Sequence, residues 1–210
     1  MDFYLSSVIQ NEGEDVMRGS AGLKSKRIID LGFSSLALIL LCPAFLFAAI
    51  LIRSTSSGPI IFWSKRFGKD GKIFAMPKFR TMKINTPDIA TDKLDDPSQY
   101  ITKVGSILRK FSLDELPQLW CVFTGEMSLV GPRPALHTQV DLFELRQKQG
   151  VNALKPGLTG LAQINGRDTL TDHQKVAFDV LYQEQQSLLT DLRIMLLTIP
   201  KIAGRSGVSH

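Results

Sequence analysis

The 210-residue sequence has only two cysteines, Cys42 and Cys121, too few for the disulfide framework of a small secreted domain. Neither has a histidine close in sequence, so we expect both to be packing residues rather than nucleophiles. The sequence also lacks zinc-ligand spacing, interleaved aromatic and basic residues of the RNA-binding kind, internal repeats and low-complexity tracts. These absences argue against a nucleic-acid partner and fit a reducing cytoplasm.

Acidic residues are unevenly distributed along a chain whose formal net charge is +5. Residues 1–20 contain four acidic side chains and one arginine, which predicts a flexible acidic tail and leaves the remainder strongly basic. A basic body can bind anionic lipid headgroups or a phosphorylated substrate. At this length we expect one domain with a sizeable core, plus accessory segments.

Residues 31–52 form a long uncharged stretch, LGFSSLALILLCPAFLFAAILI. A straight helix of this length extends about 33 Å, enough to cross a bilayer. Pro43 lies near its middle, where the missing backbone N–H interrupts helical hydrogen bonding. The sequence therefore predicts two helical segments with a break at Cys42 and Pro43.

Both flanks of this stretch are basic, with Lys24, Lys26 and Arg27 before it and Arg53 after it. The preference for cytoplasmic lysine and arginine cannot be met at both ends of a crossing helix, but it is met if both ends return to the cytoplasm. We therefore predict that residues 21–58 form a re-entrant helix–break–helix. A spanning helix with a tolerated proline is the alternative.

Residues 60–66 and 72–79 are extended-looking stretches around GKDGK, which predicts a β-hairpin. The polar, proline-punctuated segment 86–99 predicts a loop. The last apolar segment, 188–202, is too short and too charged to span a membrane, so we expect either an interfacial helix or a core helix. Further helices are predicted over 101–110, 113–123 and 139–149. The predicted fold class is α+β and mainly helical.

The segment 112–134, SLDELPQLWCVFTGEMSLVGPRP, contains adjacent carboxylates, Asp114 and Glu115, and an arginine between two prolines, Arg133. Carboxylates near a guanidinium suit phosphoryl transfer: one attacks phosphorus, one holds a divalent metal, and the arginine neutralises developing phosphate charge. The competing interpretation is structural, because Ser112 followed by Glu115 fits a helix capping box. The spacing of Leu116, Leu119, Trp120 and Phe123 predicts a core-facing helix that includes Trp120.

Several further motifs stand in a fixed order. They are KSKRIID, an apolar segment interrupted by Pro43, KIFAMPKFRTM, SLDELPQLW, GPRP, KPGLTGLAQINGR and RSGVS. Together they resemble the bacterial sugar transferases, the monotopic phosphoglycosyl transferases that begin glycoconjugate assembly on a polyprenol phosphate. The resemblance extends over residues 24–209, without the acidic tail. Cys121 stands where this family usually has asparagine, and Cys42 where serine commonly precedes the proline.

The resemblance implies that Asp114 is the nucleophile and that Glu115 binds Mg²⁺ or Mn²⁺. It also implies that Lys78, Arg80, Arg109, Arg133 and Arg167 contact substrate. From the residues alone, other interpretations stay open: a surface charge for Lys78 and Arg80, a helix C-cap for Arg109, and a glycine-rich connector around Arg167. The glycines of KPGLTGLAQINGR allow close approach of the backbone to a ligand.

The resemblance further implies the reaction and its place. Residues 59–210 would form a catalytic domain with an interfacial C-terminal helix, on the cytoplasmic face of the bacterial inner membrane. It would transfer sugar-1-phosphate from a UDP-sugar to polyprenyl (undecaprenyl) phosphate and release UMP through a phosphosugar–aspartyl intermediate, the first membrane step of glycoconjugate or polysaccharide synthesis. Expected partners are these two substrates and anionic membrane lipids, and a homodimer is compatible with the sequence.

Two alternatives to this reaction remain at the level of sequence. The first is a non-catalytic, membrane-anchored scaffold of a polysaccharide assembly complex, in which Asp114 would be dispensable. The second is a lipid-dependent glycosyltransferase that attacks the sugar carbon and releases UDP instead of UMP.

Overall fold

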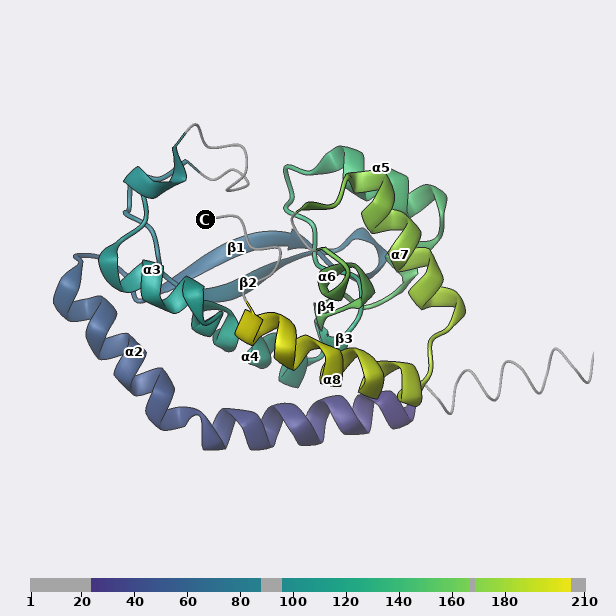
Figure 1. Ribbon diagram of the computed structural model, residues 1–210, viewed down its shortest axis with the longest axis horizontal. Coiled ribbons are helices and arrows are strands. Elements are labelled where there is room, and N and C mark those ends of the chain that lie inside the picture. The colour runs from purple at the N-terminus through teal and green to yellow at the C-terminus, as the bar shows by residue number, and fades with distance from the viewer. Residues whose placement is uncertain (1–23, 88–95, 167–168, 205–210) are drawn as a thin grey trace, which may run out of the picture.

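The computed structural model describes residues 24–87, 96–166 and 169–204 (Figure 1). The described chain is mainly helical with a small antiparallel hairpin, which confirms the predicted α+β class. Residues 1–20 and Arg167 lie outside the described residues. In chain order the elements are a helix over Lys24–Leu40, α2 (Cys42–Thr55), β1 (Ile61–Phe67), η1 (Lys69–Gly71), β2 (Ile73–Phe79), η3 (Pro97–Gln99), α3 (Lys103–Lys110), η4 (Leu113–Gln118), α4 (Leu119–Thr124), β3 (Ser128–Val130), α5 (Val140–Lys148), η5 (Val151–Ala153), β4 (Gly157–Thr159), α6 (Leu161–Ile164), α7 (Asp172–Glu184) and α8 (Leu188–Gly204).

The predicted hairpin is present and lies at the centre of the molecule (Figure 1). Strands β1 and β2 pair antiparallel, from Ile61 opposite Phe79 to Phe67 opposite Ile73. Their connection includes Asp70 and Gly71 in left-handed conformations, with φ of 55° and 76°. Aspartate and glycine are among the residues that adopt this conformation most readily, which explains why GKDGK forms the turn.

A second, two-stranded sheet was not predicted. Strands β3 and β4 pair in parallel, with Ser128 opposite Gly157 and Val130 opposite Thr159. A Cβ atom at Gly157 would lie 2.1 Å from the backbone nitrogen of Gly131, so the close approach of the two segments requires glycine at this position. At Gly157 the close approach is therefore between two segments of the chain, and approach of the KPGLTG glycines to a ligand stays a prediction.

The N-terminal apolar stretch forms two helices that meet at a 57° bend. The predicted break is present but falls at Leu41, one residue before Cys42 and Pro43, because proline is tolerated in the first turn of the helix α2 that follows. No single helix in the described ranges is both long and apolar enough to cross a bilayer, although the bent pair meets that test when its two helices are taken together. Together the two helices run along the lower edge of the molecule in Figure 1.

One side of the bent pair packs on the rest of the protein. Its buried and half-buried positions recur at helical spacing and continue through the bend: Asp30, Ser34, Ala37, Leu38, Leu41, Phe45, Ala48 and Ile52. Ala48 and Ile52 pack against Phe79 and Leu108. The opposite side exposes apolar residues such as Ile39 and Phe47.

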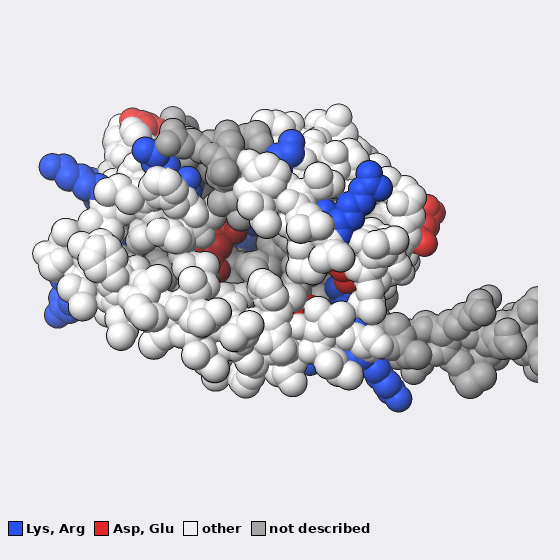
Figure 2. Space-filling model, turned by 60° about the horizontal axis from the view of Figure 1, so that its bottom comes forward, with Lys and Arg blue, Asp and Glu red and all other residues white. Residues whose placement is uncertain are grey.

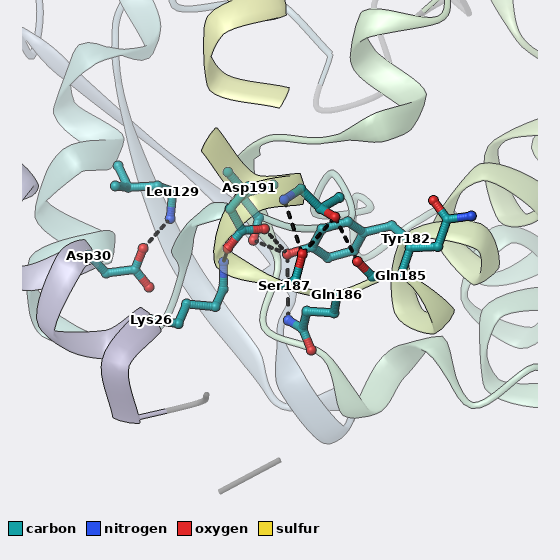
Figure 3. Close-up of polar contacts among 10 residues, drawn as sticks. Lys26, Asp30, Leu129, Tyr182, Gln185, Gln186, Ser187 and Asp191 are labelled. Carbon is teal, nitrogen blue, oxygen red and sulfur yellow. Dashed lines mark hydrogen bonds and ion pairs between the residues drawn. The ribbon is translucent and has the colours of Figure 1, made fainter. Parts of the chain in front are cut away.

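Polar contacts attach the start of the first helix to distant parts of the chain (Figure 3). Lys26 forms an ion pair with Asp191 of α8, and the Asp30 carboxylate accepts a hydrogen bond from the backbone N–H of Leu129, 2.9 Å away. Arg27 donates to the carbonyl oxygens of Val122 and Phe123 at the end of α4. Lys26 and Arg27 therefore hold the helix to the protein, a role beyond the basic flank for which the sequence singled them out.

The main core lies between the hairpin, α4, β3 and the last two helices. Its buried members include Met76, Val122, Met127, Tyr182 and Ile194. The Tyr182 hydroxyl lies 2.7 Å from Asp191 and 3.2 Å from the carbonyl oxygen of Val130, so this buried polar group is hydrogen-bonded (Figure 3).

One face of the molecule is largely uncharged (Figure 2). Helix α8 buries Asp191 and Ile194 but exposes a row of apolar side chains, among them Leu189, Leu192, Leu196 and Ile199. The buried side of this helix fits the core interpretation of 188–202, and the interfacial interpretation of its exposed apolar side stays a prediction. Trp120 is 51% exposed, so the prediction of a core position was wrong; a tryptophan at this helical spacing can equally face an apolar exterior.

Candidate active site

The two adjacent carboxylates lie in the first turn of a 3₁₀ helix rather than on a regular α-helix. Ser112 has a left-handed conformation with φ of 53°, and residues Leu113–Gln118 then form the 3₁₀ helix η4, with Pro117 inside it. Ser112 makes no side-chain capping hydrogen bond. The capping-box interpretation is therefore wrong, because a capping box needs the Ser112 hydroxyl to accept from the backbone three residues later.

Two cations contact the Glu115 carboxylate. Lys78 Nζ lies 3.2 Å and an Arg133 Nη2 lies 2.9 Å from the same oxygen, Oε1. Both contacts join elements that are distant in sequence, since Lys78 comes from β2 and Arg133 from the loop that follows β3. The structure thus brings Lys78, from a separate motif, to Glu115 and Arg133, which the sequence singled out together.

Strand alternation explains the position of Lys78. Phe74 and Met76 are buried on one face of β2, and Lys78 follows at the same spacing. The pKa of Lys78 is lowered to about 8, mainly by burial; Arg133 and Arg66 act in the same direction, whereas the charge of Glu115 acts in the opposite direction. A lysine near its pKa at neutral to alkaline pH loses its positive charge more readily than a surface lysine does.

Asp114 lies in a less polar environment than an exposed carboxylate. Burial raises its pKa, and the neighbouring charge of Glu115 raises it further, while Lys78 and Arg109 oppose the shift. Arg109 is in the last turn of α3, immediately before η4. It therefore lies close enough to stabilise the charged form of Asp114, which places a third arginine or lysine at the carboxylate pair.

Arg80 is buried at another place. Its Nη2 donates to the carbonyl oxygen and the hydroxyl of Ser56, at 3.1 and 2.7 Å, where α2 ends. Its Nε and Nη1 are buried without a hydrogen-bond partner in the described structure. The contacts of Arg80 thus stabilise the junction between α2 and the hairpin, and a substrate contact remains a prediction, as it does for Arg167.

Two positively charged residues near the site were missed. Arg66 of β1 donates from Nη1 to the carbonyl oxygen of Pro134, 3.1 Å away, and Arg146 of α5 donates to that of Arg133. Ser64 and Arg66 are polar residues two apart on the inner face of a strand, a pattern that could have identified Arg66. For Arg146, no motif in the sequence distinguishes it from a surface charge.

The carboxylate pair is a candidate ligand for a divalent cation. Asp114 and Glu115 concentrate negative charge, and burial makes that charge costly without a cation. Within the described ranges, however, no three or more His, Cys, Asp or Glu side chains gather into a metal site. Two adjacent carboxylates are chemically suited to an ion such as Mg²⁺, which takes few protein oxygens and fills its other positions with water and substrate phosphate, and a metal at this site stays a prediction.

Comparison with known proteins identifies the family of this chain. Residues 22–205 match the model of the family described as bacterial sugar transferase. The exopolysaccharide production protein ExoY of Sinorhizobium fredii is 40% identical over 87% of this chain and 87% of its own length. A UDP-glucose:undecaprenyl-phosphate glucose-1-phosphate transferase of Klebsiella pneumoniae is 42% identical over 84% of this chain and 39% of its own, and one of Caulobacter vibrioides is 39% identical over 84% and 69%.

These matches cover nearly the whole chain and define its class. The chain belongs to the bacterial sugar transferase family, and it is an enzyme of the phosphoglycosyl transferase type. The non-catalytic scaffold considered from the sequence is thereby set aside.

Proposed function

We propose that this enzyme transfers sugar-1-phosphate from a UDP-sugar to undecaprenyl phosphate and releases UMP. The observation that supports this most directly is the Asp114–Glu115 pair, with Lys78 and Arg133 on Glu115 and Arg109 beside Asp114. Two relatives are named for transfer of glucose-1-phosphate to undecaprenyl phosphate. The relatives also include a protein named as a galactosyl transferase, so the test uses a panel of UDP-sugars.

In the proposed first step, a carboxylate oxygen of Asp114 attacks the β-phosphorus, the one bonded to the sugar. A bond forms between Asp114 and phosphorus, the bond from this phosphorus to the bridging oxygen breaks, and UMP leaves with the electron pair. Lys78, Arg109 and Arg133 reduce the repulsion between an anionic nucleophile and an anionic pyrophosphate. Glu115 would hold Mg²⁺, which when bound supplies further neutralisation of phosphate charge.

In the proposed second step, a phosphate oxygen of the lipid attacks the same phosphorus. The Asp114–phosphorus bond breaks, the carboxylate is restored, and the product is a sugar linked to undecaprenyl diphosphate. The apolar exposed side of the bent helix pair and of α8 suits a site held at the surface of the inner membrane on its cytoplasmic face. There the re-entrant segment would bring a soluble and a lipid substrate together.

The test is to mix the purified enzyme with UDP-sugars alone, before any lipid is added. We expect UMP release of about one equivalent and a phosphosugar adduct at Asp114 by mass spectrometry, both absent in Asp114→Asn. Adding undecaprenyl phosphate should then discharge the adduct. Release of UDP, or release of UMP only when lipid is present and without an adduct, would contradict the proposed mechanism.

A further inference from the structure

The side chain of Arg133 contacts Glu115, but the loop around Arg133 has few backbone donors of its own, so its position depends on contacts with other elements. Pro132 and Pro134 have no backbone N–H, so the segment cannot form a hydrogen-bonded ladder of its own. A residue before proline is also restricted to extended conformations, which limits Arg133 to few backbone angles. The remaining freedom is the position of the whole segment and the orientation of its peptide planes.

Three successive carbonyl groups fix that position from three different elements. The carbonyl oxygen of Pro132 accepts from the backbone N–H of Gly157, the first residue of β4, at 2.9 Å. The oxygen of Pro134 accepts from Arg66 of β1 at 3.1 Å. The oxygen of Arg133 itself accepts from Nη1 of Arg146, on α5, at 2.8 Å.

Arg146 is in turn held by Asp179 of α7. Its Nε and Nη2 lie 2.9 and 2.7 Å from the same carboxylate oxygen, and the two side chains are 6% and 2% exposed. Burial of an ion pair is weak evidence for stabilisation, because loss of hydration offsets the attraction. A buried pair whose remaining donor is directed at one backbone carbonyl is better explained by the geometry that it imposes.

We propose that Arg146 and Asp179 are positioning residues, which orient the Arg133 peptide so that its guanidinium meets the substrate phosphate beside Glu115. The pair acts through the Arg133 carbonyl, to which Arg146 donates while Asp179 holds Arg146. This inference rests on the proposed function, since it assigns Arg133 to a phosphate.

The pair has a specific geometric requirement. Arg146 needs three donor directions at once, two toward Asp179 and one toward the loop, and only the planar guanidinium fork provides them. Lysine would keep the charge but could not satisfy both partners in the same way. Arg146→Lys should therefore lower kcat/KM for UMP release about 10–100-fold, as misplacement of a catalytic group by about 1 Å can. Lys148→Met, which removes an exposed charge from the same helix, should change nothing.

The experiment is a double-mutant cycle on UMP release with the full chain. Arg146→Met, Arg133→Ala and the double variant are compared, with thermal unfolding measured for each. If Arg146 acts through Arg133, the double variant should be no slower than Arg133→Ala alone. If Arg146→Met does not fold, Arg146→Lys and Asp179→Asn provide the same comparison.

The possible results separate the two proposals. Wild-type enzyme that releases no UMP overturns the proposed function. Wild-type enzyme that releases UMP, with losses from Arg146 and Arg133 that multiply in the double variant, overturns the positioning role and leaves the proposed function standing. A loss in every Arg146 variant that merely follows its folded fraction, equally with and without Arg133, also contradicts it.

Discussion

Lys26, near the start of the N-terminal helix, forms an ion pair with Asp191 of α8, 165 residues later in the chain (Figure 3). Both side chains are mostly buried, and Asp191 also lies 2.7 Å from the Tyr182 hydroxyl. Asp30, one turn further along the helix, accepts from Leu129 of β3. The helix thus contributes charged groups to the core of the protein, which a simple lipid anchor would not do.

The first prediction distinguishes a structural role of the helix start from a role in lipid anchoring alone, by comparing two neighbouring lysines. Lys26→Met leaves Asp191 buried without its cation, whereas Lys24→Met removes an exposed charge. Breaking a buried ion pair costs up to about 3–5 kcal/mol, and for a chain of this size about 1 kcal/mol lowers the Tm by roughly 2–4 °C. Thermal unfolding of both variants, measured in the same detergent, should show a clearly lower Tm for Lys26→Met and little change in Tm for Lys24→Met.

The control for this prediction is the double variant Lys26→Met with Asp191→Asn. It removes both charges, so it should recover part of the lost stability. Equal effects of the two single substitutions would show that the lysines act only through membrane electrostatics.

A second prediction concerns the close contact between the paired strands β3 and β4. Gly157→Ala would place a Cβ atom 2.1 Å from the Gly131 nitrogen and 2.4 Å from the Thr159 oxygen, both backbone atoms that cannot move aside cheaply. The loop of Arg133 follows directly, so we expect loss of both folded yield and UMP release. The matched substitution is Gly32→Ala, where no atom lies within 4 Å. Since alanine favours a helix by about 1 kcal/mol, that variant should be as stable as the parent or more so.

The break between the two N-terminal helices and the hairpin could be predicted because each depends on local chemistry, and the charged residues because they stand in recognisable motifs. Pro43 cannot continue a helix, GKDGK suits a tight turn, and the motif order singled out Asp114, Glu115 and Arg133. Pairing between distant segments could not be predicted in this way. The β3–β4 pair and the contact of Arg146 with Arg133 depend on how the chain folds over sequence separations that no local pattern records.

Trp120 illustrates a different limit. Its spacing relative to Leu119 and Phe123 is that of an amphipathic helix, and such spacing shows which residues share a face. It does not show whether that face meets protein or a second apolar medium. Trp120 is half exposed and lies 5.6 Å from Phe123 in a tilted ring contact, on the outside of α4.

A third prediction follows from Lys78, whose pKa burial lowers to about 8. Because the folded pKa is below the unfolded value of 10.5, folding releases a proton between these values, and the stability cost of the buried charge is relieved as pH rises through this window. The catalytic effect has the opposite sign, since neutral Lys78 no longer attracts phosphate. Plots of kcat/KM for UMP release against pH should fall on the alkaline side near pH 8.

Replacing Lys78 with arginine provides the check on that assignment. Arginine stays protonated throughout this range, so Lys78→Arg should move the alkaline fall to higher pH even if the maximal rate is lower. Lys72→Arg, on the exposed turn of the hairpin, should leave the profile unchanged. An alkaline fall that stays near pH 8 in Lys78→Arg would assign it to another group.

The last prediction compares the two roles that the sequence allowed for the segment beginning at Ser112. The Ser112 hydroxyl makes no capping bond, and its backbone is left-handed, a conformation that glycine adopts without cost. Ser112→Gly should therefore leave UMP release intact and stability unchanged or slightly higher.

Glu115→Gln keeps the size of the side chain but removes the charge that Lys78 and Arg133 contact. We expect a loss of at least about 100-fold in kcat/KM, typical of removing one electrostatic group from an active site, with the folded structure retained by circular dichroism. If Ser112→Gly and Glu115→Gln instead lowered stability together and activity in proportion, the segment would be a helix cap and the assignment of Glu115 to the active site would fail.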